Sequence, residues 1–211
     1  MKTVFLVGDS IRIGYQDRVR DLLGEDYTVY TVDENCRYTK FTLWGMFSWT
    51  EGLGMQHFDL IHWNTGIWDL HRATADGEIF TSLEDYVKEN KRLYIQMKSY
   101  SDNLVWATII PGGRQLDDQV KSNALINTDA THPKVFLCAD QKTWNNDVQR
   151  YNEAARKMYE SNGVAINDLY AAVAGNTDLY ISEDGIHPTP AGYEVLAQQT
   201  AAIIRQRLAD L

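Results

Sequence analysis

Residues 3–14 read Thr-Val-Phe-Leu-Val-Gly-Asp-Ser-Ile-Arg-Ile-Gly, and this stretch decides the fold. Its first five residues form an apolar run rich in β-branched side chains, which is typical of a buried strand. Gly8-Asp9-Ser10 follows as a turn, and a segment with helical spacing comes next. We therefore expect the chain to open with a strand, a tight turn and a helix.

The rest of the chain repeats this pattern. Including the first, we predict five buried strands, over Thr3–Val7, Tyr27–Val32, Phe58–Trp63, Leu104–Ile110 and Gly163–Asn167. We predict helices over Gly14–Leu23, Leu83–Tyr100, Trp144–Ser161 and Pro190–Leu211, the last with Thr189 as N-cap. Strands that alternate with helices indicate a parallel sheet covered on both faces.

Two connections are longer than this alternation needs. Asp33–Gln56 is rich in aromatic residues, and Pro111–Thr143 has little periodicity. Connections longer than about 12 to 15 residues are usually binding loops or lids. In a parallel sheet the ligand site lies at the carboxyl ends of the strands, and we expect both connections to border it as irregular loops.

Composition and charge limit the class of protein. The chain has 211 residues, 44% of them hydrophobic, and no repeat or linker divides it, so we predict one domain over residues 1–211. Lys and Arg total 20 against 29 Asp and Glu, a net charge of −9, so we expect no nucleic-acid partner.

No apolar run approaches the ~20 residues that span a bilayer, so we expect no membrane insertion. Met1-Lys2-Thr3 leads directly into the first strand without a cleavable leader, so we expect a cytoplasmic protein.

Ser10 is a candidate nucleophile. It follows the first predicted strand and precedes a helix, so its hydroxyl should lie at the carboxyl edge of the sheet, near the N–H groups of the helix N-terminus. A serine hydroxyl is a poor nucleophile unless a neighbouring base takes its proton. The alternative is that Ser10 only caps the helix.

His187 is the candidate base. It lies in Asp184-Gly185-Ile186-His187-Pro188, after the last strand and before the final helix. A carboxylate three residues away across a glycine turn can fold back onto the imidazole and set its tautomer. The alternative is a surface turn with two unrelated polar residues.

The remaining histidines and the cysteines suggest no metal or redox site. His57, His62, His71 and His132 form no tight ligand pair, and Cys36 and Cys138 have no CxxC spacing. We expect a packed His62, a His132 in a loop, two reduced thiols and no metal. Asn64 ends the third strand, where its amide could donate to an oxyanion, although an asparagine there is often only a turn former.

Taken together, Gly8-Asp9-Ser10, Asn64 and Asp184-Gly185-Ile186-His187-Pro188 resemble blocks of the SGNH (GDSL-type) hydrolase family. The resemblance implies a three-layer α/β/α sandwich with a five-stranded parallel sheet, similar to flavodoxin. It also implies catalysis by Ser10, His187 and Asp184 without a cofactor, with Asn64 binding the oxyanion.

Two blocks depart from the family pattern. The second block usually supplies a glycine N–H to the oxyanion, and here the segment reads Asp33-Glu34-Asn35-Cys36-Arg37. We expect the backbone N–H of Cys36 to take that place, because the donor is main chain. The third block is usually GxND, whereas His62-Trp63-Asn64-Thr65 lacks its glycine and its aspartate.

The resemblance implies hydrolysis of a small carboxylic ester through an acyl-enzyme. We expect Tyr15, Trp44, Trp49, Trp63 and Trp68 near the rim of the pocket, where aromatic faces suit sugar rings, or else in core packing. The sequence has no obvious long apolar lid, which favours short acyl groups such as acetyl on a carbohydrate. Alternatives are a lysophospholipase or thioesterase, a glycan-binding module without activity, and a flavin or nucleotide protein, although no glycine-rich phosphate loop follows the first strand.

Overall fold

The computed structural model describes residues 1–72, 76–126 and 139–209 of the chain. Five strands form one parallel sheet in the order β2-β1-β3-β4-β5. The strands are β1 (Lys2–Val7), β2 (Tyr27–Thr31), β3 (Leu60–Asn64), β4 (Leu104–Ala107) and β5 (Ala165–Asn167). The helices are α1 (Ser10–Leu23), α2 (Thr39–Gly52), α3 (Leu83–Lys98), α4 (Gln115–Ile126), α5 (Gln141–Glu160), α6 (Leu169–Ala174), α7 (Thr177–Tyr180) and α8 (Pro190–Arg207).

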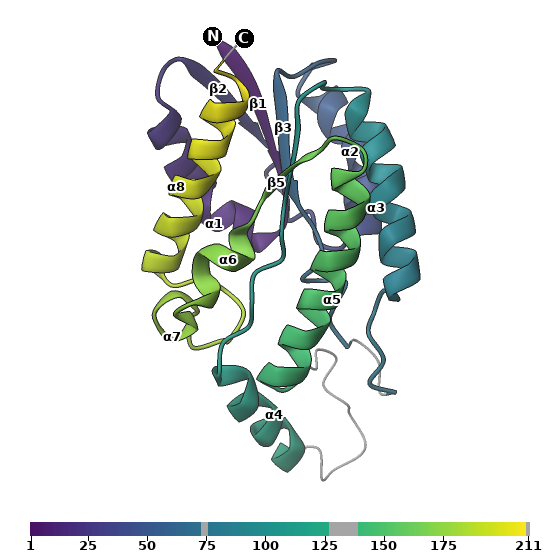
Figure 1. Ribbon diagram of the computed structural model, residues 1–211, viewed down its shortest axis with the longest axis vertical. Coiled ribbons are helices and arrows are strands. Elements are labelled where there is room, and N and C mark those ends of the chain that lie inside the picture. The colour runs from purple at the N-terminus through teal and green to yellow at the C-terminus, as the bar shows by residue number, and fades with distance from the viewer. Residues whose placement is uncertain (73–75, 127–138, 210–211) are drawn as a thin grey trace.

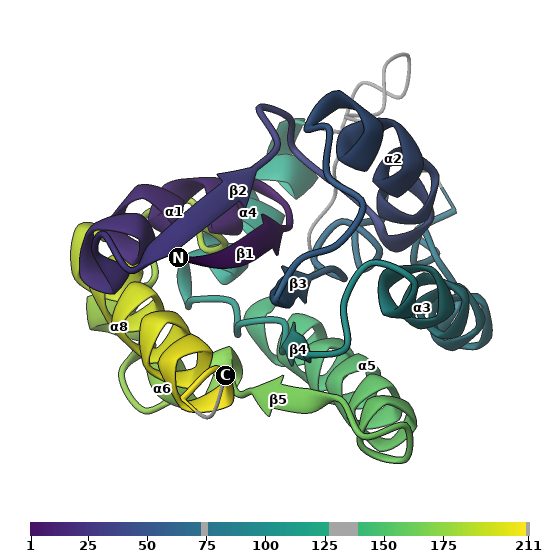
Figure 2. The ribbon, with the colours of Figure 1, turned by 90° about the horizontal axis from the view of Figure 1, so that it is seen from above.

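Helices cover both faces of the sheet. Seen from above, α1 and α8 lie on one face, and α2, α3 and α5 lie on the other (Figure 2). The carboxyl ends of the strands point towards the end of the molecule where α4 and α7 lie (Figure 1). The predicted three-layer α/β/α sandwich with a five-stranded parallel sheet is thereby confirmed.

The central strands are buried because helices cover both of their sides. All five residues of β3 are buried, as are all four of β4. Trp63 and Trp106 are fully buried there, and their rings lie 5.2 Å and 5.0 Å from the ring of Tyr159 on α5. Strands buried on both faces read as continuous apolar runs rather than alternating ones, which is why these segments could be predicted.

Capping side chains set the starts of the two helices that flank the site. In α8, Thr189 accepts a hydrogen bond from the N–H of Gly192, and Pro190 occupies the first turn, as predicted. Helix α1 begins at Ser10, four residues before the predicted start at Gly14, because Asp9 accepts a hydrogen bond from the N–H of Ile11. The alternative in which Ser10 caps this helix is wrong, since Asp9 is the cap.

The prediction of two irregular loops is also wrong. Asp33–Gln56 contains α2, whose Trp44 and Phe47 are exposed, so the helix shows no simple apolar stripe. Pro111–Thr143 contains α4 and the start of α5, which Asp140 caps by accepting from the N–H of Thr143. His132 and Cys138 lie outside the described residues.

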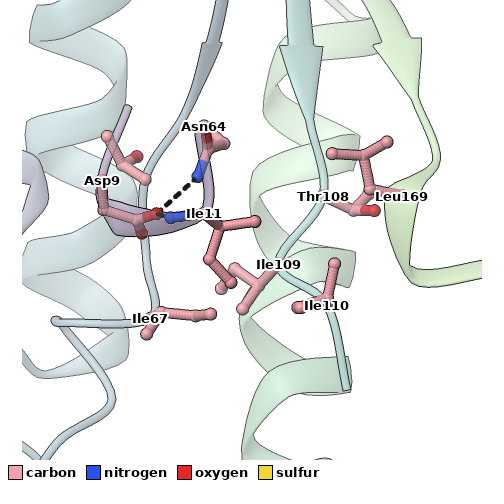
Figure 3. A pocket seen from close by; sticks show the side chains of 9 residues that line it. Asp9, Ile11, Asn64, Ile67, Thr108, Ile109, Ile110 and Leu169 are labelled. Carbon is pink, nitrogen blue, oxygen red and sulfur yellow. Dashed lines mark hydrogen bonds between the residues drawn. The ribbon is translucent and has the colours of Figure 1, made fainter. Parts of the chain in front are cut away.

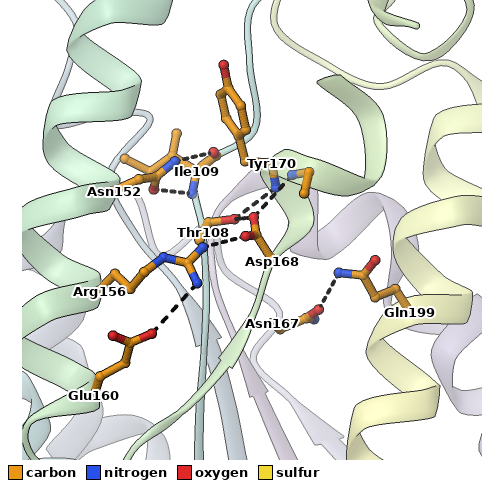
Figure 4. Close-up of polar contacts among 10 residues, drawn as sticks. Thr108, Ile109, Asn152, Arg156, Glu160, Asn167, Asp168, Tyr170 and Gln199 are labelled. Atoms are coloured by element: carbon orange, nitrogen blue, oxygen red, sulfur yellow. Dashed lines mark hydrogen bonds and ion pairs between the residues drawn. The ribbon is translucent and has the colours of Figure 1, made fainter. Parts of the chain in front are cut away.

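The predicted fourth strand, Leu104–Ile110, ends early in the structure. The sheet pairing stops at Ala107, yet Ile109 and Ile110 remain buried. The side chain of Asn152 on α5 accepts from the N–H of Ile109 and donates to its carbonyl, both at 2.8 Å. These two bonds replace a neighbouring strand, as Figure 4 shows. An apolar run reports burial and cannot distinguish a strand from such a segment.

Within the described residues, no helix is both long and apolar enough to cross a membrane.

The burial pattern predicts a large difference between two isoleucines. Ile61 in β3 is fully buried, whereas Ile95 on α3 is 61% exposed. Ile61→Ala should lower the free energy of unfolding by about 2 to 5 kcal/mol, because it removes apolar contacts and leaves a cavity. Ile95→Ala, the matched control, should change it by less than about 0.5 kcal/mol. Urea unfolding followed by circular dichroism measures both, and equal losses would contradict the burial of β3.

Candidate active site

Ser10, His187 and Asp184 form a continuous chain of hydrogen bonds. The Oγ of Ser10 lies 2.8 Å from Nε2 of His187, and Nδ1 of His187 lies 2.7 Å from Oδ2 of Asp184. The structure therefore brings together three side chains that the sequence places up to 177 positions apart. This is the order of nucleophile, base and orienting carboxylate found in acyl-transfer sites.

The loop between α7 and α8 has a defined shape. Ile181 and Pro188 form an antiparallel bridge, and the N–H of Ser182 donates to the carbonyl of His187 at 2.8 Å. Gly185, at φ +75°, closes the turn in a conformation that favours glycine. These bonds hold Asp184 and His187 on the same side of the loop.

Asp184 is held as a carboxylate. Partial burial acts to raise its pKa, but hydrogen bonds from the backbone of Ile186 and His187, then from the His187 ring and Ser182, outweigh burial and lower it. A carboxylate can only accept, so Nδ1 of His187 carries the proton and donates it to Asp184. The Nε2 atom is then the acceptor for the Ser10 hydroxyl, which is the tautomer a general base needs.

Asn64 lies beside the turn that carries Ser10. Its Nδ2 donates to Oδ1 of Asp9 at 3.2 Å, and both side chains are buried. A Cβ on Gly8 would lie only 2.1 Å from Oδ1 of Asn64, so only glycine permits this approach. Ser10 is the first residue of α1, so its own N–H has no acceptor within the helix. The Ser10 N–H and the Asn64 amide thus lie at the same edge of the sheet.

Cys36 contacts the turn that carries Ser10, but its N–H has a partner. Cys36 is fully buried and donates from its N–H to the carbonyl of Gly8 at 3.1 Å. The next residue, Arg37, has φ +49° and donates from its N–H to Oδ1 of Asn35 at 2.8 Å. A role for the Cys36 N–H at an oxyanion requires release of its bond to Gly8, and that role stays a prediction.

A cleft of about 470 Å³ opens above these groups. Its lining combines α1, α4 and three loops: Ser10, Asn35, Ile67, Trp68, His71, Gln119, Asp184, Ile186 and His187. Asn35 and Gln119 come from the two long connections, so both connections border the site as expected.

Trp68 lines the cleft, in agreement with its predicted place near the rim, and His71 is an unpredicted lining residue. They follow Asn64 by four and seven positions, in the loop after β3. Burial lowers the pKa of His71, whose Nδ1 lies 2.8 Å from the carbonyl of Ile67. The signal that could have found His71 is its place shortly after a central strand, since that loop must lie at the carboxyl edge.

A much smaller cavity, of about 10 Å³, adjoins the cleft. It is lined by Asp9, Ile11, Asn64, Thr65, Ile67, Thr108, Ile109, Ile110 and Leu169, as Figure 3 shows. Ile67 lines both spaces. The cavity has room for about one water molecule or a similarly small group, and most of its wall is apolar.

Polar contacts fix the far wall of this cavity (Figure 4). The hydroxyl of Thr108 donates to Oδ1 of Asp168 at 3.2 Å and accepts from the N–H of Tyr170 at 2.8 Å. Asp168 also pairs with Arg156 of α5. Together with the bonds between Asn152 and Ile109, these contacts hold the segment after β4 in one position.

Most of the aromatic residues predicted near the rim lie elsewhere. Tyr15 and Trp63 are fully buried in the core, because α1 and β3 turn them away from the carboxyl edge. Trp44 lines a separate groove between α2 and α3, and the indole of Trp49 donates to Glu34. Trp68 is the member of this set that lines the cleft.

His62 is packed in the core, as predicted. His62 is fully buried, its Nε2 lies 2.9 Å from Nδ2 of Asn167, and burial lowers its pKa to about 3. It is a neutral packed residue. Among residues 1–72, 76–126 and 139–209, no three His, Cys, Asp or Glu side chains gather closely enough to hold a metal ion.

The sequence and the fold are similar to known proteins. A model of the GDSL-like lipase/acylhydrolase family matches residues 6–195. A search of curated protein sequences finds no match.

Solved structures of similar fold span nearly the whole chain. An acetylxylan esterase from Geobacillus stearothermophilus has a TM-score of 0.69 at 16% identity, covering 96% of this chain and 94% of that one. A lipase/acylhydrolase from Enterococcus faecalis has a TM-score of 0.68 at 16% identity, covering 98% and 97%. A GDSL-like lipase from Bacteroides thetaiotaomicron has a TM-score of 0.66 at 15% identity, covering 98% and 89%. At these identities the likeness shows a shared fold.

The geometry predicts that one serine is unusually reactive. A fluorophosphonate modifies serine hydroxyls that a neighbouring base activates, so it should label Ser10 and leave Ser10→Ala unmodified. His187→Asn should slow labelling by about 10²- to 10⁴-fold. Ser48→Ala on α2, whose hydroxyl donates to the carbonyl of Gly45, is the control and should react like the wild type. Intact mass and peptide mapping give the site and rate; equal labelling of Ser10→Ala would refute this assignment.

Proposed function

The chain belongs to the GDSL-like lipase/acylhydrolase family, and we propose that it hydrolyses a small carboxylic ester through Ser10, His187 and Asp184. Family membership makes it a hydrolase that acts on esters; the triad and the substrate are our proposal. The observation that carries it is the unbroken chain of contacts, 2.8 Å from Ser10 to His187 and 2.7 Å from His187 to Asp184.

In the first half of the reaction, His187 removes the proton of Ser10 as Oγ attacks the ester carbonyl. The Ser10 N–H and the Asn64 amide donate to the oxygen that becomes negative, and the Cys36 N–H joins them if it leaves Gly8. When the C–O bond to the alcohol breaks, the imidazolium of His187 returns the proton to the departing alkoxide. Asp184 stabilises the imidazolium between these two steps. The products are an alcohol and an acyl-enzyme on Ser10.

In the second half, water replaces the alcohol. His187 takes a proton from the water as its oxygen attacks the acyl-enzyme, and the same donors bind the new oxyanion. Collapse of the tetrahedral intermediate breaks the bond to Oγ, and His187 returns the proton to Ser10. A carboxylic acid leaves, and the hydrogen bond between Ser10 and His187 forms again.

The size of the cavity beside Asn64 supports a short acyl group. The cavity of about 10 Å³ shares Ile67 with the catalytic cleft, and four isoleucines and Leu169 form its apolar wall. An acetyl methyl fits a space of that scale, whereas a long acyl chain needs apolar room that this wall does not offer. This opposes the lysophospholipase and thioesterase alternatives.

The cleft supports a carbohydrate as the alcohol portion. Trp68 lies in its wall, and an aromatic face suits a sugar ring. Two of the similar structures are acetylxylan esterases. We therefore propose O-acetyl groups of a carbohydrate as the substrate class. The hydrogen-bonded triad favours this reaction over a glycan-binding module without activity, which needs no activated serine.

The proposed function predicts the enzymatic activity of the protein. Wild-type protein should hydrolyse p-nitrophenyl acetate faster than the butyrate, octanoate and decanoate esters, and should release acetate from acetylated xylo-oligosaccharides. Ser10→Ala should lose at least about 10⁴-fold in kcat while keeping its fold, because the nucleophile is gone. Absorbance at 400 nm and acetate release measure the two reactions. Full activity in Ser10→Ala, or the fastest turnover on the decanoate, would contradict the proposal.

The proposed acyl cavity predicts how the rate of hydrolysis depends on acyl length. Ile67 is 5% exposed and separates the small cavity from the cleft. Ile67→Ala should enlarge the acyl space and raise the ratio of butyrate to acetate kcat/KM by about tenfold, since one or two methylene groups are worth about 1 to 3 kcal/mol in such a pocket. Ile13→Ala on α1, 40% exposed, is the control and should leave the ratio unchanged. An unchanged ratio in Ile67→Ala would place the acyl group elsewhere.

A further inference from the structure

Arg12 is a charged side chain that the proposed reaction does not use. It lies on α1, two residues after Ser10, and is fully buried. Charged residues are rarely buried completely unless their charge and their hydrogen bonds are satisfied. The surroundings of this guanidinium therefore indicate what it does.

The guanidinium of Arg12 holds two loops together. Its Nη2 donates to the carbonyl of Gly8 at 3.1 Å and to the carbonyl of Glu34 at 2.7 Å. Its Nη1 donates to the carbonyl of Val32 at 3.1 Å, and Cys36 Sγ lies 3.8 Å from Nη2. Gly8 belongs to the turn that carries Ser10, and the other three lie in the segment that joins β2 to α2.

The two loops also bond to each other at the same point. The carbonyl of Gly8 accepts from the N–H of Cys36 at 3.1 Å as well as from Arg12. Arg12 therefore bonds to both sides of the contact between Cys36 and Gly8. The position of residues 35–37 depends on this contact. A planar guanidinium with five N–H donors suits this task, because it bonds several carbonyls in a set geometry.

Arg12 also acts on the group that holds Asn64. Burial raises the pKa of Asp9, and the hydrogen bonds to Ile11 and Asn64, with the charge of Arg12, oppose that effect. Asp9 accepts the amide of Asn64 through Oδ1. The positive charge of Arg12 thus favours the carboxylate form of Asp9, which accepts this bond more strongly than a neutral carboxyl group does.

Stability alone does not explain a buried guanidinium here. Removing a charge from water costs several kcal/mol, and a well-packed apolar side chain of similar size often gives a fold of equal or greater stability. The side chain of Arg12 is instead aimed at the backbone that surrounds Ser10. Its contacts match a positional role better than a stabilising one.

We propose that Arg12 is a positioning residue: it ties the Gly8 turn to the segment Asp33–Tyr38 and so keeps the Ser10 N–H and the Asn64 amide in the geometry needed for oxyanion binding. The inference rests on the proposed function, because it concerns the same site. Without the guanidinium of Arg12, the Gly8 turn moves relative to Asn64, and these two donors no longer converge where negative charge develops. The loss falls on the transition state, whereas binding of the uncharged ester changes little.

The test compares Arg12→Met and Arg12→Lys with Arg18→Met. Arg18 lies on the same helix, is exposed and pairs with Glu194, so it controls for loss of an arginine. Arg12→Met should lower kcat for p-nitrophenyl acetate by about 10²-fold, the effect of a misplacement of about 1 Å, with KM within about twofold. Arg12→Lys should restore less than a tenth of the lost kcat, because a point charge cannot bond three carbonyls.

A second readout separates a positional role from a structural one. The rate of Ser10 labelling by a fluorophosphonate should fall in parallel with kcat, measured on protein whose circular dichroism and unfolding midpoint show a native fold. Arg18→Met should match the wild type in both rates. If Arg12→Met does not fold, Arg12→Lys decides the question with the same two rates.

The outcomes distinguish the two proposals. Wild-type kcat and labelling rate in a folded Arg12 variant would overturn the role of Arg12 and leave the esterase proposal intact. A wild-type protein that is labelled but hydrolyses no ester would overturn the proposed substrate, while a slower labelling rate in Arg12→Met would still support the role of Arg12. A wild-type protein that does neither would overturn both.

Discussion

Parallel pairing of β1 with β3, with Val7 opposite Trp63, is the constraint on which the site depends. The pairing brings the ends of two neighbouring strands to one edge, so the turn at Gly8 and the side chain of Asn64 lie against each other. The absence of a side chain at Gly8 lets them approach so closely. Once this contact is made, α1 starts at Ser10 and points its first N–H groups at the same edge.

The site is built from polar groups that are expensive to bury. Asp9, Arg12 and Asn64 are all buried, and Oδ2 of Asp9 and Oδ1 of Asn64 have no hydrogen-bond partner among the described residues. A core selected for stability alone would avoid such groups, because each unpaired polar atom costs about 1 to 3 kcal/mol. In the proposed reaction the benefit is that donors are aimed in advance at the developing charge, since they need no reorganisation.

The departures from the family pattern have local explanations. Thr65 stands where the family usually has aspartate, and its hydroxyl donates to Oδ1 of Asn90, which also accepts from Tyr159. The segment after β2 lacks the usual glycine, and Arg37 has a positive φ in this loop. In our proposal the chemistry stays at Ser10, Asn64 and the loop that carries His187.

Local patterns in the sequence determined the five strands, the helices α1, α3, α5 and α8, the turn at Ser10 and the loop from Asp184 to His187. Each depends on residues that are near neighbours in the chain, so apolar runs, caps and short spacings report them directly. The tertiary structure alone decided the contact of Cys36 with Gly8, the support of Ile109 by Asn152, the bonds of Arg12 to the backbone of two loops and the size of the small cavity beside Asn64. These features depend on distances between segments that lie far apart in the chain. No local pattern records such distances, because the packing of the whole core sets them.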